Sequence, residues 1–120
     1  MKKVHSVILI FFIIVAVVLI ALYYLSNEKN SSAILYFGNT CPHCKIVEDF
    51  IKENNITSKF AVESKEVYDN LENALELENV AKSCNISKDA IGVPLLYYNE
   101  KCYVGDNDII TLLEKETGVK

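Results

Sequence analysis

The sequence predicts an α/β sandwich around one central sheet, preceded by a single N-terminal membrane-spanning helix. Two patterns support this prediction. An unbroken apolar run occupies residues 7–25, and after it short apolar runs typical of strands alternate with segments whose apolar residues recur at helical spacing. The expected order after the apolar run is β-α-β-α-β-β-α, with the strands and helices packed in layers around one core.

The apolar run has the length and composition of a membrane anchor. Residues 7–25 are 19 positions without a charge, a glycine, a proline or a side-chain amide. As a helix they would extend about 28 Å, close to the thickness of a bilayer's hydrocarbon core. Lys2 and Lys3 precede the run, so the positive-inside rule leaves residues 1–6 in the cytoplasm and the C-terminal part outside it. We expect an uncleaved signal anchor, because a cleaved signal peptide has a shorter apolar region and small residues at its cleavage site.

The part of the chain after the anchor is acidic. A polar linker is expected at residues 26–32 and the folded domain at residues 33–120. Fully extended, the linker spans no more than about 25 Å, which keeps the domain close to the membrane. Ten lysines against 16 acidic residues give this part a net charge of −6, and the chain has no arginine. Nucleic-acid binding is therefore a poor candidate function, because little would neutralise the phosphates.

The first half of the predicted domain has two strands and a helix. Residues 33–37 form a short continuous apolar run, typical of a strand that is buried on both faces. Pro42 can occupy the first position of a helix that continues to about Asn54. A second strand is expected at residues 58–62, and Ser64 can then cap a second helix.

The second half is expected to contain a hairpin and a closing helix. Residues 92–94, Gly-Val-Pro, lead into a strand at residues 95–98, and a turn then leads into the return strand at residues 102–104. Asp106 or Asn107 is the expected cap of the last helix.

The motif Cys41-Pro42-His43-Cys44 has the composition and position that thiol–disulfide exchange requires. Exchange needs two sulfurs within bonding reach, one of which ionises near neutral pH. Cys41 would lie at the N-terminus of a helix, where unpaired N–H groups and the helix dipole stabilise a thiolate, and Cys44, one turn later, would resolve mixed disulfides. Pro42 begins the helix without an extra unpaired donor, and a protonated His43 adds positive charge beside the sulfur. We therefore predict a low pKa for Cys41 and an oxidising couple.

A structural zinc site is the alternative interpretation of this motif. The chain has four cysteines; 39 residues separate the C-x-x-C pair from Cys84, and 17 residues separate Cys84 from Cys102. Zinc ribbons and fingers normally supply their ligands as two close pairs, and only one close pair exists here. The sequence therefore favours redox chemistry, with no metal or organic cofactor.

The chain resembles the thioredoxin superfamily over about residues 32–118. The resemblance lies in the order of a strand, a C-x-x-C motif, a helix and a Val-Pro dipeptide that opens a hairpin. The motif at residues 41–44 matches that of bacterial periplasmic thiol oxidases. This resemblance implies a thioredoxin-like fold, with a central mixed sheet flanked by helices. It also implies a cis peptide bond before Pro94, a proline that faces Cys41, and pairing of the Val93 backbone with bound substrate.

The stretch 95–108 resembles the compact glutaredoxin-like branch, but three departures limit what the resemblance implies. Leu35 occupies the position where many relatives have a buried acid that accepts a proton from the second thiol. The chain has no inserted helical domain of the kind that forms a deep peptide groove in larger oxidases. Asn39-Thr40 and a single Gly105 replace the lysine and the second glycine of glutaredoxins, so the resemblance does not extend to glutathione binding.

Cys84 and Cys102 remain once the first pair is assigned, and four cysteines permit three pairings. A Cys84–Cys102 bond would enclose the proline loop in a ring of 19 residues, and by loop entropy it would contribute on the order of 3 kcal/mol. We expect a structural disulfide, because the predicted compartment is oxidising. There are two alternatives for Cys84 and Cys102. They could form a second redox pair that relays electrons to a membrane partner, or they could be two buried free thiols.

Together these features predict a membrane-anchored, extracytoplasmic thiol–disulfide oxidoreductase that acts on protein thiols and disulfides, with oxidation favoured. Cys41 would exchange, Cys44 would resolve, His43 would tune the pair, and Val93 and Pro94 would guide the substrate. A membrane redox partner would reset the pair. The alternatives are a disulfide reductase or electron relay of the same fold, a metal-binding module and a non-catalytic interaction domain.

Overall fold

The structure, a computed structural model, describes residues 1–26 and 32–120. Most of the predicted polar linker, residues 27–31, therefore lies outside the described residues. The chain divides into two compact units, Met1–Asn30 and Ser31–Lys120. Each unit is described by itself.

The first unit is one long helix, α1 (Lys2–Ser26). Its segment Lys2–Tyr24 has a mean hydropathy of 3.2, and none of that surface is buried against the rest of the chain. It is the one helix among the described residues that is long and apolar enough to cross a membrane. The predicted span, residues 7–25, lies within α1. By length and composition α1 is suited to cross a membrane.

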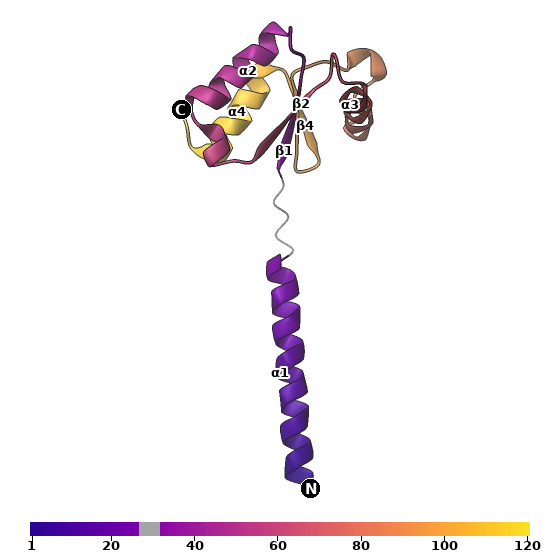
Figure 1. The fold of residues 1–120 in the computed structure, drawn as a ribbon, viewed down its shortest axis with the longest axis vertical. Helices are drawn as coiled ribbons and strands as arrows, with labels where there is room; N and C mark the ends of the chain where they lie inside the picture. Colours follow the sequence, from indigo (N-terminus) through magenta and orange to yellow (C-terminus); the bar gives the residue numbers. More distant parts are fainter. Residues whose placement is uncertain (27–31) are drawn as a thin grey trace. The chain divides into compact units, whose positions relative to one another are not determined.

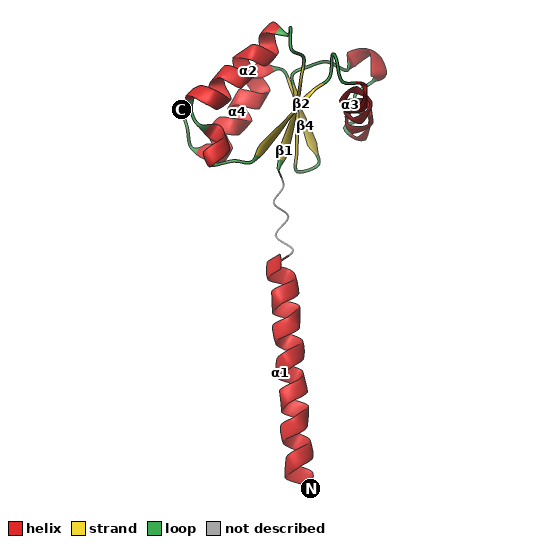
Figure 2. Ribbon diagram, viewed as in Figure 1, coloured by secondary structure: helices red, strands yellow, loops and turns green. Residues whose placement is uncertain are grey.

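The second unit contains a four-stranded mixed sheet with the strand order β2-β1-β3-β4 (Figure 2). β1 (Ala33–Phe37) pairs parallel with β2 (Val62–Glu66) and antiparallel with β3 (Leu95–Tyr98). β3 in turn pairs antiparallel with β4 (Lys101–Val104). With its helices, the unit has the order β-α-β-α-β-β-α, so the predicted fold class is confirmed.

Helices cover both faces of this sheet. α2 (Pro42–Glu53) and α4 (Asp106–Thr117) lie on one face, and α3 (Leu71–Ser83) lies on the other (Figure 1). Two short 3₁₀ helices, Ile56–Ser58 and Lys88–Ala90, lie in the connections.

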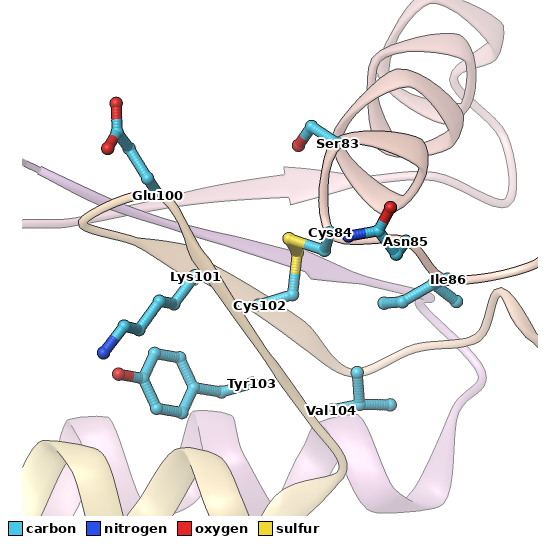
Figure 3. A pocket seen from close by; sticks show the side chains of 9 residues that line it. All are labelled: Ser83, Cys84, Asn85, Ile86, Glu100, Lys101, Cys102, Tyr103 and Val104. Atoms are coloured by element: carbon cyan, nitrogen blue, oxygen red, sulfur yellow. A yellow bond between two sulfur atoms is a disulfide. The ribbon is translucent and has the colours of Figure 1, made fainter.

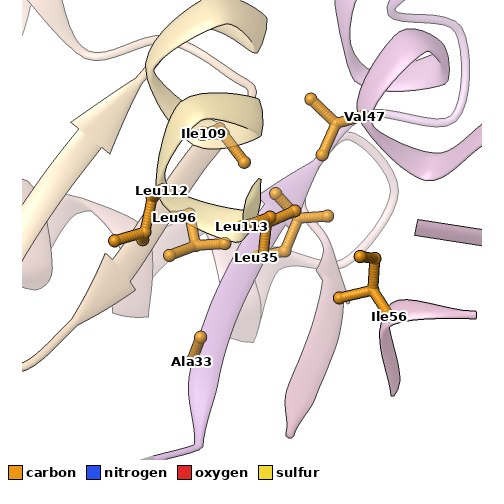
Figure 4. Packing of buried hydrophobic residues seen from close by; sticks show 8 residues of the cluster. All are labelled: Ala33, Leu35, Val47, Ile56, Leu96, Ile109, Leu112 and Leu113. Atoms are coloured by element: carbon orange, nitrogen blue, oxygen red, sulfur yellow. The ribbon is translucent and has the colours of Figure 1, made fainter. Parts of the chain in front are cut away.

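The core has two parts because successive strand residues point to opposite faces. Leu35 and Leu96 are fully buried beneath α2 and α4 (Figure 4), whereas Tyr36 and Leu95 are fully buried on the α3 side. The larger cluster, on the α2 and α4 side, consists of Ala33, Leu35, Val47, Ile56, Leu96, Ile109, Leu112 and Leu113. β1 is central and covered on both faces, which explains why its sequence is continuously apolar rather than alternating.

The prediction of a second strand at residues 58–62 is wrong. Residues 56–58 form a 3₁₀ turn, and the strand is instead Val62–Glu66, a mostly polar segment. β2 is an edge strand with solvent on one side, so its pairing with β1, and not hydrophobic burial, sets its position. The apolar residues Phe60 and Val62 pack against the core from the strand's start and preceding loop.

Both predicted helix caps are wrong as well. Ser64 lies within β2, opposite Leu35. α3 begins later, because the side chain of Asn70 accepts a hydrogen bond from the Asn73 backbone N–H at 3.1 Å and so caps the helix. The residue before α4 is Gly105, with φ at 88°, a conformation that glycine adopts without steric cost. Asp106 is thereby the first helical residue of α4 rather than its cap.

The strand directions determine where the loops meet. β1, β2 and β4 run the same way, and β3 runs opposite to them. The ends of β1, β2 and β4 and the start of β3 therefore lie at one edge of the sheet. The segments 38–41, 67–70, 93–94 and 105–106 converge there, and we call this edge the loop edge.

Candidate active site

Cys41 lies at the loop edge, at the N-terminus of α2, where its conformation is extended and Pro42 follows as the first helical residue. Its Sγ accepts a hydrogen bond from the Cys44 backbone N–H at 3.1 Å, so the sulfur itself caps the helix. Cys44 is fully buried, whereas Cys41 is partly exposed. The two form a disulfide with their Cα atoms 5.2 Å apart. One sulfur thus faces solvent at the positive end of a helix, and the other lies behind it.

The loop before β3 lies against this sulfur. The Val93–Pro94 peptide bond is cis, and the carbonyl oxygen of Val93 is 3.6 Å from the Cys41 Sγ. The Gly105 backbone N–H donates to the Pro94 carbonyl at 2.9 Å, which ties the proline loop to the end of β4. The structure therefore brings together the sequence-predicted residues Cys41, Val93 and Pro94.

His43 is directed toward a partner that sequence reasoning missed. Its Nδ1 lies 3.1 Å from Oδ2 of Asp106, the first residue of α4. The histidine side chain is 70% exposed, but that of Asp106 is only 19% exposed. The hydrogen bond from His43, reinforced by the Asn107 backbone N–H, lowers the pKa of the Asp106 carboxyl below its usual range. The carboxylate is thus a fixed negative charge beside the histidine.

The topology brings this pair together. α2 follows β1 and α4 follows β4, and because both strands run the same way the two helices begin at the same edge on the same face. The sequence contained a signal for the partner, namely acids in the first turn of the last helix. It could not identify which acid faces His43.

A second loop packs against the segment before Cys41. The ring of Tyr68 lies on Gly38, so closely that a Cβ there would be 2.3 Å from the ring and would displace it. The side-chain amide of Asn39 donates to the Asp69 carboxylate. Glu66 accepts from the backbone N–H groups of Tyr68 and Asp69 at 2.7 and 2.9 Å. Partial burial would raise the pKa of Glu66, but these N–H bonds outweigh it and lower that pKa.

Cys84 and Cys102 form the second disulfide, with their Cα atoms 6.0 Å apart. The bond joins the C-terminal end of α3 to β4 and borders a pocket of about 480 Å³ (Figure 3). Cys84 is the C-cap of α3, the negative end of a helix, whereas Cys41 is at a positive end. The pair encloses the segment that carries Val93 and Pro94.

The core beneath the site contains no carboxylate. Leu35 is fully buried, and no charged side chain among the described residues is fully buried. A proton leaving the buried Cys44 thiol would therefore pass to solvent or to substrate rather than to an internal acid. Among the residues that the structure describes, no three His, Cys, Asp or Glu side chains are grouped as metal ligands would be.

Comparison with known proteins places the fold. No protein-family model matches the sequence, and no curated protein matches it. Among solved structures, glutaredoxin-1 of Archaeoglobus fulgidus is 21% identical with a TM-score of 0.51, over 78% of this chain and 90% of that protein. Glutaredoxin 1 of Francisella tularensis, complexed with cacodylate, is 19% identical with a TM-score of 0.49, over 70% and 93%. Oxidised glutaredoxin 2 of Chlamydomonas reinhardtii is 18% identical with a TM-score of 0.48, over 75% and 85%. At these identities the likeness concerns the fold alone, which is thioredoxin-like.

Proposed function

We propose that this thioredoxin-like chain is a membrane-anchored thiol–disulfide oxidoreductase that acts on protein thiols outside the cytoplasm. The observation that carries the proposal is the 3.1 Å hydrogen bond from the Cys44 N–H to the Cys41 sulfur at the start of α2. After reduction the same N–H and the helix dipole would stabilise a Cys41 thiolate. A half-exposed sulfur that can ionise, bonded to a buried one, is the arrangement that exchange requires.

The reaction is a pair of thiolate displacements. A substrate thiolate attacks the Cys41 sulfur, a mixed disulfide forms, and Cys44 leaves as a thiolate. A second substrate thiolate then attacks the substrate sulfur of the mixed disulfide, and Cys41 leaves with its electron pair. The substrate loses two electrons and two protons, and the Cys41–Cys44 pair gains both. The reverse sequence reduces a substrate disulfide.

Val93 and the loop edge would orient the substrate. The Val93 carbonyl lies 3.6 Å from the Cys41 sulfur, so a polypeptide that pairs with this backbone would hold its own sulfur close to the reacting one. Backbone pairing is independent of side chains, which suits an enzyme that acts on many proteins.

The anchor supports a location at the membrane. α1 has the length and apolar composition of a spanning helix, and the lysines at its start would remain in the cytoplasm. The domain would then lie in an oxidising compartment, where a membrane redox partner restores the pair after each turnover.

The direction of exchange depends on His43. A free imidazolium beside Cys41 would stabilise the thiolate and make the pair oxidising, but Asp106 carries the opposite charge 3.1 Å away. The Asp106 carboxylate would offset a positive charge on His43 and so favours a less oxidising couple than the motif alone predicts, which makes a disulfide reductase of the same fold the second candidate. Oxidation of substrate thiols is the first candidate because the N-terminus of α2 acts directly on the Cys41 sulfur.

The test is the reduction potential of the Cys41–Cys44 pair in the full chain, measured by equilibration in thiol redox buffers and mass spectrometry after alkylation. A value near about −120 mV supports oxidation and one near about −270 mV supports reduction. A Cys44→Ser variant should trap client proteins as mixed disulfides through Cys41. A pair that exchanges with neither dithiothreitol nor protein thiols would rule out both candidates.

A further inference from the structure

An exposed apolar surface lies at the start of α3. The side chains of Tyr68, Leu71 and Leu75 are 56%, 73% and 53% exposed. Leu71 and Leu75 are one turn apart on α3, and Tyr68 lies just before the helix. Single exposed apolar residues are ordinary, but two one turn apart on a helix and a third just before it indicate a contact surface. We call these three residues the α3 surface.

The α3 surface is continuous with the candidate active site. The Tyr68 ring lies on Gly38, and the Cys41 backbone N–H donates to the Gly38 carbonyl at 3.1 Å. The Asn39 side chain is bonded to Asp69, the residue after Tyr68. A polypeptide with a cysteine at Cys41 could therefore reach Tyr68, where the α3 surface begins, from the loop edge.

The charge around this surface is strongly negative. Residues 63–78 contain six acidic residues and one lysine, a net charge of −5 out of −6 for the whole part after the anchor. The lysine, Lys65, is bound to Glu76 at 2.7 Å, and Lys88 reaches Glu78 at 3.0 Å. Glu72 lies on the same turn as Leu71 and is exposed. A partner that covers the leucines must therefore face carboxylates.

We infer that the α3 surface binds cysteine-containing segments of client proteins that combine apolar with Lys or Arg side chains. This inference rests on the proposed function, because it supplies the substrate preference of the same site. Charge complementarity selects the occupant. A second copy of the chain would bring two acidic surfaces together, and an anionic lipid surface would be repelled in the same way. An unfolded basic segment supplies both apolar contacts and cations.

The inference can be tested with three peptides that each contain two cysteines and the same apolar residues. The cysteines are flanked by Lys in the first peptide, by Ser in the second and by Glu in the third. Oxidation is followed by the loss of peptide thiols, using the full chain in zwitterionic phosphatidylcholine nanodiscs. We expect the Lys peptide to react about tenfold or more faster than the Glu peptide at low ionic strength, and the difference to shrink strongly at about 0.5 M salt.

Two variants separate the contributions of charge and apolar contact. Glu72→Lys should reduce the preference for the Lys peptide, whereas Glu116→Lys, at the far end of α4 on the other face of the sheet, should preserve it. Leu71→Ser combined with Leu75→Ser should slow all three peptides about threefold to tenfold, because buried leucine area is lost from the complex. Exchange with dithiothreitol, an uncharged dithiol, should be unchanged in every variant.

Equal rates for the three peptides, or full activity of the double leucine variant, would overturn the inference. If the wild type binds anionic vesicles saturably and the double leucine variant does not, the surface binds lipid instead. Self-association that the leucine variant abolishes would assign it to a second copy. Normal exchange with dithiothreitol in any of these cases would leave the proposed function intact, whereas failure of that exchange would remove it.

Discussion

Removal of the second disulfide should destabilise the domain by an amount that follows from its position in the chain. Cys84 and Cys102 are 18 residues apart, so their bond closes a ring of 19 residues. For a ring of this length the loop-entropy relation gives about 3 kcal/mol at 25 °C. Both side chains are only partly buried, so the cavity left by the sulfurs adds little. We expect Cys84→Ser combined with Cys102→Ser to lower the free energy of unfolding by about 3 kcal/mol.

Urea titration of the full chain, followed by the far-UV signal of the domain, measures this change. With a slope of about 1–3 kcal/mol per molar urea, the midpoint should fall by about 1–3 M. The matched double alanine variant should fall equally, because the effect lies in the unfolded chain and not in the substituted side chains. A loss below about 1 kcal/mol would contradict the entropic account.

Four further predictions concern the site and the core. In graded dithiothreitol the Cys41–Cys44 disulfide should open at a lower concentration than the Cys84–Cys102 disulfide, as read by alkylation and peptide mass; the opposite order would contradict the helix-end assignment. Asp106→Asn should raise the reduction potential of the pair by removing the negative charge beside His43, and a His43→Ala background should abolish the shift. Leu96→Ala should lower the free energy of unfolding by about 2–5 kcal/mol, measured by urea titration, whereas Leu75→Ala on the exposed face should change it little. The urea midpoint should stay level from pH 7 to about pH 5 and fall below about pH 4. Folding lowers the pKa values of the Glu66, Glu76 and Asp106 carboxyls. The stability that this gives is present above the carboxyl pKa of the unfolded chain and is lost as the pH falls through the pKa of the folded chain.

The elements that the sequence predicts well are those whose burial gives them a strong pattern. β1 is central and apolar throughout, and α2 begins at a proline, so both could be assigned from residues alone. The β3–β4 hairpin follows from two apolar runs around the turn Asn99-Glu100, whose φ angles of 49° and 62° are those of a tight hairpin turn. Buried or turn-defined segments therefore needed no tertiary information.

The wrong sequence predictions concern elements whose position is set by tertiary contacts and not by a hydrophobic pattern. β2 is a polar edge strand, and only its pairing with β1 distinguishes it from a loop. Its Lys65 is held by Glu76 of α3, and Glu76 also accepts from the Tyr36 hydroxyl at 2.7 Å. Burial, and after it this bond, raise the pKa of the Tyr36 phenol. Asp106 could not be distinguished from Asp108 as the partner of His43 without knowing how α4 packs beside α2. The position of Tyr68 on Gly38 had no sequence signal except the glycine itself.

The two disulfides illustrate how one physical effect yields opposite properties at the two ends of a helix. Cys41 caps the N-terminus of α2, where the Cys44 N–H donates to its sulfur and a leaving thiolate would be stabilised. Cys84 is the C-cap of α3, at the negative end of that helix dipole, so release of its thiolate would be disfavoured. A reductant should therefore open the first bond while the second still encloses the segment that holds Val93 and Pro94. Under the proposed function, the loop of Val93 and Pro94 would then keep its position in both redox states of the reacting pair, so a cycle of exchange would not disturb the surface that orients the substrate.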